Sequence, residues 1–295
     1  MRFTLAAAAP VPVVVPALVP ALVAVLVAAG PAVADAPALA HPESVVMAGE
    51  QGFVSNLGQA LDTSTRDGDG FIARIGPQGE VLDGPAIPQP GTPLDSPKGL
   101  ALLGGRLYVA DIDRIVAFDP TTGRQLAEYR PEGARSLNDL APAGERLLVT
   151  DFEAGRVLSL DPGTGRFDVI ASGIGGANGV VADGDRAYVV ATGAQLEGGG
   201  ITRIDLTSGA TTPVGDLHGR FDGVALAADG ALIVSDWLAM GTPTPGRILR
   251  VDPATGAAEP VAAPAMQGPA DLARSGDRLL VPVMLEHRVA VLPAP

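Results

Sequence analysis

Oxygen-bearing side chains recur at one position of a repeated phrase, and such a set of oxygens could bind a hard cation. The phrase is an apolar run, a turn and a second apolar run, as in NDLAPAGERLLVTD at 138–151, and it occurs six times. Its first position holds Glu43, Lys98, Asn138, Asn178, Asp222 and Ala270 in chain order. Four of these side chains offer a carboxylate or amide oxygen, which are the ligands that Ca²⁺ prefers. Four such ligands would leave coordination positions for water or substrate.

A structural interpretation of the same residues stands beside the chemical one. Asn178-Gly179 and Asp222-Gly223 are common turn pairs, and each could begin a tight turn without any chemical role. That explanation does not cover Glu43, which precedes Ser44-Val45-Val46 and is not a favoured turn former. The shared register of the four residues favours the metal site.

The elements that must position these residues are β-strands. The copies start roughly 40 to 55 residues apart, a period typical of propellers and other stacked repeats. A second phrase, as in VLSLDPGTG at 157–165, follows four of the copies, and its Pro and closing Gly predict a tight turn between antiparallel strands. Four strands per copy predict an all-β fold, a six-bladed β-propeller of four-stranded antiparallel blades. The first position of each phrase would then enter the innermost strand, near the axis.

The two ends of the chain differ from the repeats. Residues 1–34 predict a secretory signal peptide, with Arg2, a long apolar stretch and a cleavage pattern at Ala32-Val33-Ala34. A retained membrane anchor is the alternative, although four prolines within the stretch disfavour a spanning helix. Residues 35–295 would form the propeller, in a secreted or periplasmic protein. The last copy lacks a fourth strand, which we expect residues 37–40 to supply.

Composition excludes several functions. The net charge of −13 disfavours nucleic acids and anionic lipids as partners, and the absence of cysteine excludes disulfides and thiol chemistry. The three histidines form no metal-type pair, and no phosphate-binding loop occurs. We therefore expect a monomer that acts on a small molecule, binds no nucleic acid and has no membrane association after signal cleavage.

Four motifs resemble those of the senescence-marker-protein / gluconolactonase / luciferin-regenerating-enzyme family over residues 41–295. They are Pro42-Glu43-Ser44-Val45-Val46, Asn138-Asp139, Asn178-Gly179 and Asp222-Gly223. The resemblance implies a six-bladed propeller with one divalent metal on its axis, usually Ca²⁺, with Zn²⁺ or Mn²⁺ as alternatives. Glu43, Asn138, Asn178 and Asp222 would be its ligands. The implied activity is hydrolysis of a lactone or ester, in which the metal polarises the carbonyl and Asp222 activates water.

The chain departs from the family pattern at two places. Sugar lactonases of the family carry an arginine two residues before the first Asn ligand. Here Ser136 stands there, beside Arg135, so both are candidate substrate-binding residues and sugar specificity is not implied. Lys98, the only lysine, has two interpretations. Near the axis it would hold a substrate anion or act as a catalytic acid or base; otherwise it pairs with Asp111 or Asp113 in its own blade.

Three long connections between second and third strands are expected on the ligand face, at 57–70, 192–200 and 237–246. Such loops commonly form substrate walls, and the third contains Trp237, the only tryptophan. The rival function is a non-catalytic exported propeller that binds a ligand or protein around a structural metal. The DPxTG turns, which resemble those of NHL-type binding propellers, support that alternative, and the fold alone cannot decide.

Overall fold

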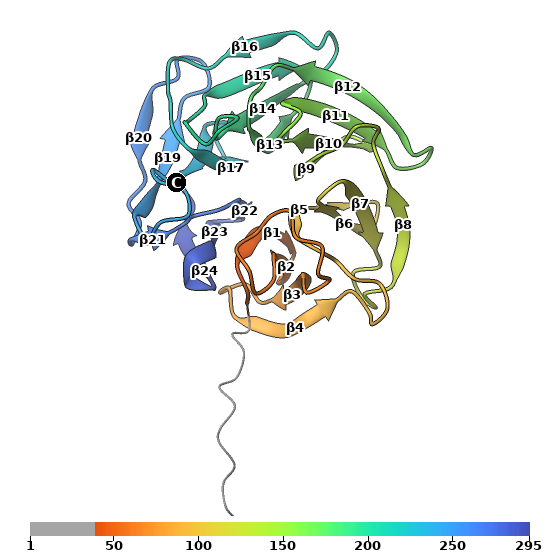
Figure 1. The fold of residues 1–295 in the computed structure, drawn as a ribbon. Coiled ribbons are helices and arrows are strands. Elements are labelled where there is room, and N and C mark those ends of the chain that lie inside the picture. Colours follow the sequence, from red (N-terminus) through yellow and green to blue (C-terminus); the bar gives the residue numbers. More distant parts are fainter. Residues whose placement is uncertain (1–38) are drawn as a thin grey trace, which may run out of the picture. The chain divides into compact units, whose positions relative to one another are not determined.

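The computed structural model describes residues 39–295, which form a ring of six antiparallel β-sheets (Figure 1). The predicted six-bladed β-propeller is confirmed. The predicted signal peptide at 1–34 lies outside the described residues. Within 39–295 no helix is long and apolar enough to cross a membrane.

Each of the first three blades has four strands. The first comprises β1 (Pro42–Ala48), β2 (Gln51–Asn56), β3 (Phe71–Ile75) and β4 (Val81–Ile87). The second comprises β5 (Pro97–Leu103), β6 (Arg106–Asp111), β7 (Arg114–Phe118) and β8 (Gln125–Tyr129). The third comprises β9 (Leu137–Ala143), β10 (Arg146–Asp151), β11 (Arg156–Asp161) and β12 (Arg166–Ser172). The lowest-numbered strand of each blade lies nearest the centre (Figure 1).

The remaining blades follow the same order with shorter outer strands. The fourth comprises β13 (Ala177–Asp183), β14 (Arg186–Ala191), β15 (Ile201–Asp205) and β16 (Thr211–Pro213). The fifth comprises β17 (Phe221–Leu226), β18 (Leu232–Asp236), β19 (Pro245–Val251), β20 (Ala258–Pro260) and the short β21 (Met266–Gln267). The sixth comprises β22 (Ala273–Ser275), β23 (Arg278–Val283) and β24 (Arg288–Pro293), with the 3-10 helix η1 (Met284–Glu286) between the last two strands.

The turn between the third and fourth strands has the predicted chemistry. In the third blade Oδ1 of Asp161 accepts hydrogen bonds from the backbone N–H groups of Gly163 (2.9 Å) and Thr164 (3.2 Å). Gly165 closes the turn with a φ of 75°, in the left-handed region that glycine adopts most easily. The local sequence therefore sets where the outer strand begins.

A β-bulge at the start of the innermost strand directs the first position of the phrase. In the fourth blade the pairing register shifts between Ala177 and Val180, which flank Asn178 and Gly179. The same shift occurs in the first, second, third and fifth blades. Bulges re-aim side chains and occur often beside functional sites. Asn178-Gly179 and Asp222-Gly223 thus lie within strands, and the interpretation that they begin tight turns is wrong.

Glycine after the first position lets neighbouring blades approach closely. A Cβ atom on Gly179 would lie 2.5 Å from the carbonyl oxygen of Asp222, on the next blade. Gly223 would meet the backbone of Asp271 at the same distance. Neither contact can relax by rotation of a side chain, so these glycines fix the spacing of the inner strands.

Three blades share an ion pair between a buried Asp and a partly exposed Arg that supports the entry to the inner strand. An Asp at the end of the second strand pairs with an Arg at the start of the third: Asp111 with Arg114, Asp151 with Arg156 and Asp236 with Arg247. The Asp also accepts a hydrogen bond from the backbone just before the inner strand, as from Ser96 to Asp111 (2.8 Å). The pair therefore supports the approach to the axis.

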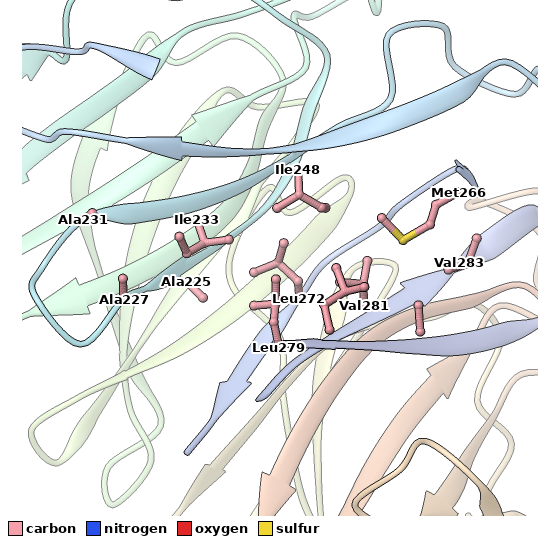
Figure 2. Packing of buried hydrophobic residues seen from close by; sticks show 12 residues of the cluster. Ala225, Ala227, Ala231, Ile233, Ile248, Met266, Leu272, Leu279, Val281 and Val283 are labelled. Carbon is pink, nitrogen blue, oxygen red and sulfur yellow. The ribbon is translucent and has the colours of Figure 1, made fainter. Parts of the chain in front are cut away.

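The core consists of apolar layers between adjacent blades. Figure 2 shows one of them, in which Ile233 and Ile248 of the fifth blade pack against Leu272, Leu279 and Val281 of the sixth. These five residues are at most 4 % exposed. Equivalent clusters lie between the other blades and hold the ring together.

Residues 37–40 were expected to supply a fourth strand to the last blade, and for the two described residues, Leu39 and Ala40, this prediction is wrong. Leu39 and Ala40 form a bend, and the sixth blade has three strands within residues 39–295. The backbone of Ala40 bonds instead to the first blade, through Oδ1 of Asn56 and the N–H of Gly58, so it cannot pair with β24. The first and last blades meet through apolar packing and through a hydrogen bond from the N–H of His41 to Nδ1 of His287 (3.1 Å).

Candidate active site

Seven of the eight candidate residues line one cavity of about 390 Å³ where the inner strands begin. They are Glu43, Lys98, Ser136, Asn138, Asn178, Asp222 and Trp237. Arg135 is exposed and does not line this cavity. The bulges bring five of these side chains together, one from each of five blades, so the shared register of the first position corresponds to a shared place in space.

Two oxygens of this set suit a metal ion because they lack any other partner. Oε2 of Glu43 and Oδ1 of Asn178 are buried and have no hydrogen bond within residues 39–295. Buried polar atoms are nearly always paired, so two orphaned oxygens that line the same cavity from two different blades call for an explanation. A hard cation would satisfy both. Within the described residues no group of three or more His, Asp or Glu side chains could hold a metal, and the amides of Asn138 and Asn178 would have to complete the site.

The orientation of the Asn178 amide follows from its neighbours. Thr192 donates its hydroxyl hydrogen to the carbonyl of Phe221 (2.7 Å), so its oxygen can only accept the bond that Nδ2 of Asn178 makes to it (2.8 Å). A hydroxyl has one hydrogen, and this fixes which end of the amide faces Thr192. Oδ1 of Asn178 is therefore the atom left for a ligand.

Burial and repulsion from neighbouring carboxylates disfavour the charged forms of the two carboxyl groups, Glu43 and Asp222. Burial raises the pKa of Glu43 well above its usual range, and the nearby charges of Asp222 and Asp271 raise it further. Burial and the charge of Asp271 raise the pKa of Asp222 to about 7. A divalent cation would relieve this repulsion. The raised pKa values and the two unpaired oxygens therefore both favour a cation at this place.

Trp237 acts on Asp222 directly. Its Nε1–H donates a 2.6 Å hydrogen bond to Oδ2 of Asp222, and the indole is 2 % exposed. This bond favours the charged carboxylate and lowers the pKa of Asp222, against the effect of burial. Trp237 was expected as a wall of the pocket, and it also orients the candidate base.

Lys98 lies at the axis and not in an ion pair of its own blade. Its side chain is 1 % exposed and lines the cavity, and Nζ donates to the carbonyl of Thr63 (3.3 Å). Asp111 pairs with Arg114 instead, and Asp113 pairs with Arg66 and Arg130. Burial lowers the pKa of Lys98, which makes its proton easier to donate.

Side chains at the second position of the phrase bond to the next blade and so support the residues at the first position. They were not among the residues predicted from the sequence. Oδ2 of Asp139 accepts from the backbone of Val180 on the next blade (2.7 Å), and Oδ2 of Asp271 accepts from the hydroxyl of Ser44 (2.6 Å). Burial raises the pKa of Asp139 well above its usual range and that of Asp271 to about 6. Aligning the second column, which holds only Ser, Gly and Asp, would have revealed these residues.

The long loops form the walls of the cavity, as expected from their lengths. The first contributes Leu61 and Thr63, the second Thr192 and Leu196, and the third Trp237, Met240 and Gly241. Phe152 and Met284 also line the cavity and were not singled out in the sequence. Most of the wall is apolar, while the polar groups gather where the inner strands begin.

Replacing Trp237 with phenylalanine tests the bond to Asp222. Without the Nε1–H donor the pKa of Asp222 should rise, because a hydrogen bond to a carboxylate is worth about 1.5–3 kcal/mol. We expect the pKa of the Asp222 carboxyl, followed by its ¹³C NMR chemical shift, to move up by about one unit. Phe152→Leu, a change of wall residue without a bond to Asp222, should leave this pKa in place. An unshifted pKa in Trp237→Phe would show that the bond does not tune Asp222.

Comparisons with known proteins agree with the fold and do not assign a family. Residues 89–168, the second blade and most of the third, match the model described as outer membrane protein assembly factor BamB. No curated protein matches the chain.

The similarity to several solved structures covers most of the six-bladed ring. Hydrazine synthase of Kuenenia stuttgartiensis is 16 % identical over 87 % of this chain and 77 % of its own, with a TM-score of 0.61. A nidogen/laminin complex is 15 % identical over 86 % and 89 %, with a TM-score of 0.60. Virginiamycin B lyase of Staphylococcus aureus is 12 % identical over 86 % and 95 %, with a TM-score of 0.61. At these identities the likeness concerns the propeller fold alone.

Proposed function

We propose that this protein is a metal-dependent hydrolase of a lactone or ester. The observation that carries the proposal is the pair of orphaned buried oxygens, on Glu43 and Asn178, in a cavity shared with Asp222 and Lys98. Buried polar atoms that no protein group pairs are rare and indicate a bound ligand or ion. The fold is compatible with catalysis, since solved propellers of similar fold include proteins named as a synthase and a lyase.

Glu43, Asn138, Asn178 and Asp222 would hold one divalent metal, with Ca²⁺ preferred because all four ligands offer oxygen and none is a histidine or a thiolate. Zn²⁺ or Mn²⁺ remains an alternative for activity. When bound, the metal would supply polarisation of the substrate carbonyl.

The chain itself would move the protons. Asp222 takes a proton from the attacking water, and the indole of Trp237 keeps its carboxylate oriented while it does so. The water oxygen would bond to the carbonyl carbon, the C–O bond of the lactone or ester would then break, and the leaving alkoxide would take a proton from Nζ of Lys98, whose pKa burial lowers. Asp222 would then lose its proton to solvent and Lys98 would regain one, which restores both groups. The products are a hydroxy acid or an acid and an alcohol. Ser136 lines the cavity and would contact the substrate.

The protein would work outside the cytoplasm on a small molecule, as a secreted or periplasmic monomer. The apolar stretch at residues 1–34, the net charge of −13 and the lack of a basic surface excess support this proposal.

A screen of lactones and aryl esters with Ca²⁺, Mn²⁺ and Zn²⁺ tests the function. We expect turnover with at least one metal, loss of turnover with chelator, and a large loss in Lys98→Met that leaves metal binding intact. Metal binding without any turnover would instead support the non-catalytic binding propeller. A melting temperature that does not change with any of the three metals would contradict the proposed metal site itself.

A further inference from the structure

Exposed leucines gather at the mouth of the cavity. Large hydrophobic side chains are rarely left exposed in groups, and such groups often mark binding sites. The large hydrophobic side chains that are exposed within residues 39–295 are Leu61, Leu82, Val169, Leu196 and Leu238. Three of the five belong to the three long loops that wall the cavity, one leucine to each loop.

Two of these leucines are presented by a strained and braced backbone. Leu196 and Leu238 both have a φ of 61°, a conformation that leucine adopts at a cost. Arg220 lies between them: its Nε donates to the carbonyl of Leu196 and its Nη1 to the carbonyl of Leu238, each at 2.8 Å. One guanidinium thus joins the second and third loops and fixes both leucines at the rim.

The wall below the rim continues the apolar surface inward. Leu61 and Leu196 line the cavity together with Phe152, Trp237, Met240 and Met284. Two polar groups of the wall are already engaged, since the backbone carbonyl of Thr63 accepts from Lys98 and the Thr192 hydroxyl bonds to Asn178 and Phe221. A substrate rich in hydroxyl groups would leave many of them without partners along this largely apolar wall, which is costly.

We propose that the substrate carries an apolar substituent, an alkyl chain or aryl ring, that lies along this wall and leaves past Leu61 and Leu196. This inference rests on the proposed function and names its substrate class. The reactive carbonyl would lie among the polar groups, and the apolar substituent would extend toward the rim. A cavity of about 390 Å³ is in the size range of small-molecule sites and would enclose a medium-length chain.

A series of γ-lactones with unbranched alkyl substituents tests the proposal in the full-length protein. We expect kcat/KM to rise about three- to fourfold for each added methylene, from γ-valerolactone to γ-undecalactone, until the chain passes the rim. A hydroxylated sugar lactone should be a poorer substrate than γ-undecalactone. A flat series, or faster turnover of the sugar lactone, would overturn the inference.

Variants of the rim locate the effect. In the double variant Leu61→Ser with Leu196→Asn, the ratio of kcat/KM between γ-undecalactone and γ-valerolactone should fall at least tenfold. Asparagine tolerates the left-handed backbone better than leucine, so this change does not add strain. Leu82→Ser, at an exposed leucine on β4, the outermost strand of the first blade, is the matched control and should keep the ratio. An unchanged ratio in the double variant would contradict the proposal.

A binding experiment separates this inference from the hydrolase function. γ-Lactams with the same alkyl chains resist hydrolysis, and calorimetry on the Ca²⁺-loaded protein would measure their Kd. A Kd that falls about threefold per methylene, and no longer does so in the double variant, would support the apolar wall even if no lactone is turned over. A Kd independent of chain length would refute it even in an active hydrolase.

Discussion

Replacing Asp222 with asparagine should lower kcat/KM for the best lactone or ester by about a thousandfold, the scale of a lost general base. Asparagine keeps the shape of the side chain and can still accept the hydrogen bond from Trp237, so the cavity should stay intact. It cannot take a proton from water, and it weakens the metal site by one negative charge. The stabilisation of the variant by added Ca²⁺ should therefore fall as well.

The same variant should be more stable than the parent when metal is removed. At pH 8 the parent carries a buried carboxylate at position 222 whose pKa is raised by burial and by Asp271. Removing that charge relieves the repulsion, and the melting temperature in chelator should rise by several degrees. Asp183→Asn, the same change at the exposed end of β13, is the control and should alter neither quantity. A less active variant that is also less stable without metal would show that Asp222 serves the fold.

The metal-free protein should be more stable at pH 5 than at pH 8, with a melting temperature higher by about 10 °C. Burial raises the folded-state pKa of Asp222 to about 7 and that of Asp271 to about 6, while an unfolded Asp titrates near 4. A raised folded pKa gives stability that is present below the unfolded value and is lost as pH rises through the folded value. The loss should fall between about pH 4 and pH 7.

Thermal unfolding in chelator across this range checks the expectation. The lowered pKa of His287 acts in the opposite direction, since burial favours its neutral ring, but it is one group against the two buried aspartates. Saturating Ca²⁺ should reduce the dependence on pH, because the cation compensates the charges at high pH and competes with protons at low pH. Stability that rises steadily from pH 5 to pH 8 without metal would contradict the buried carboxylate cluster.

The repeated phrase was enough to predict the number of blades and the turns between their outer strands. It also predicted that the residues at the first position of the phrase lie close together. Apolar alternation and Asp-Pro turns are local signals, and each blade depends on local pairing. The convergence of Glu43, Asn138, Asn178 and Asp222 followed from their register alone. Closure at residues 37–40 was not predictable in the same way, because Leu39 and Ala40 depend on contacts with Asn56 and Gly58 that no repeat copy contains.

The details of the site depend on contacts that are distant in sequence. The bond from Trp237 to Asp222 and the bracing of two loops by Arg220 each join residues of different elements. Position in the phrase cannot reveal them, since a loop residue has no fixed register. The place of Lys98 was left open in the sequence because a lysine side chain is long, and the engagement of Asp111 and Asp113 by arginines decided it.

The glycines between the blades have a consequence for selectivity among cations. Backbone meets backbone at Gly179 and Gly223, so the distances between neighbouring inner strands are set by atoms that have no rotamers to change. The oxygens that these strands carry are thereby held at nearly fixed separations before any ion arrives. With the proposed metal bound there, such a preorganised ring would discriminate by ionic radius, because an ion that is too small could not draw the ligands inward. The spacing of the inner strands would then determine which metal ion the protein binds.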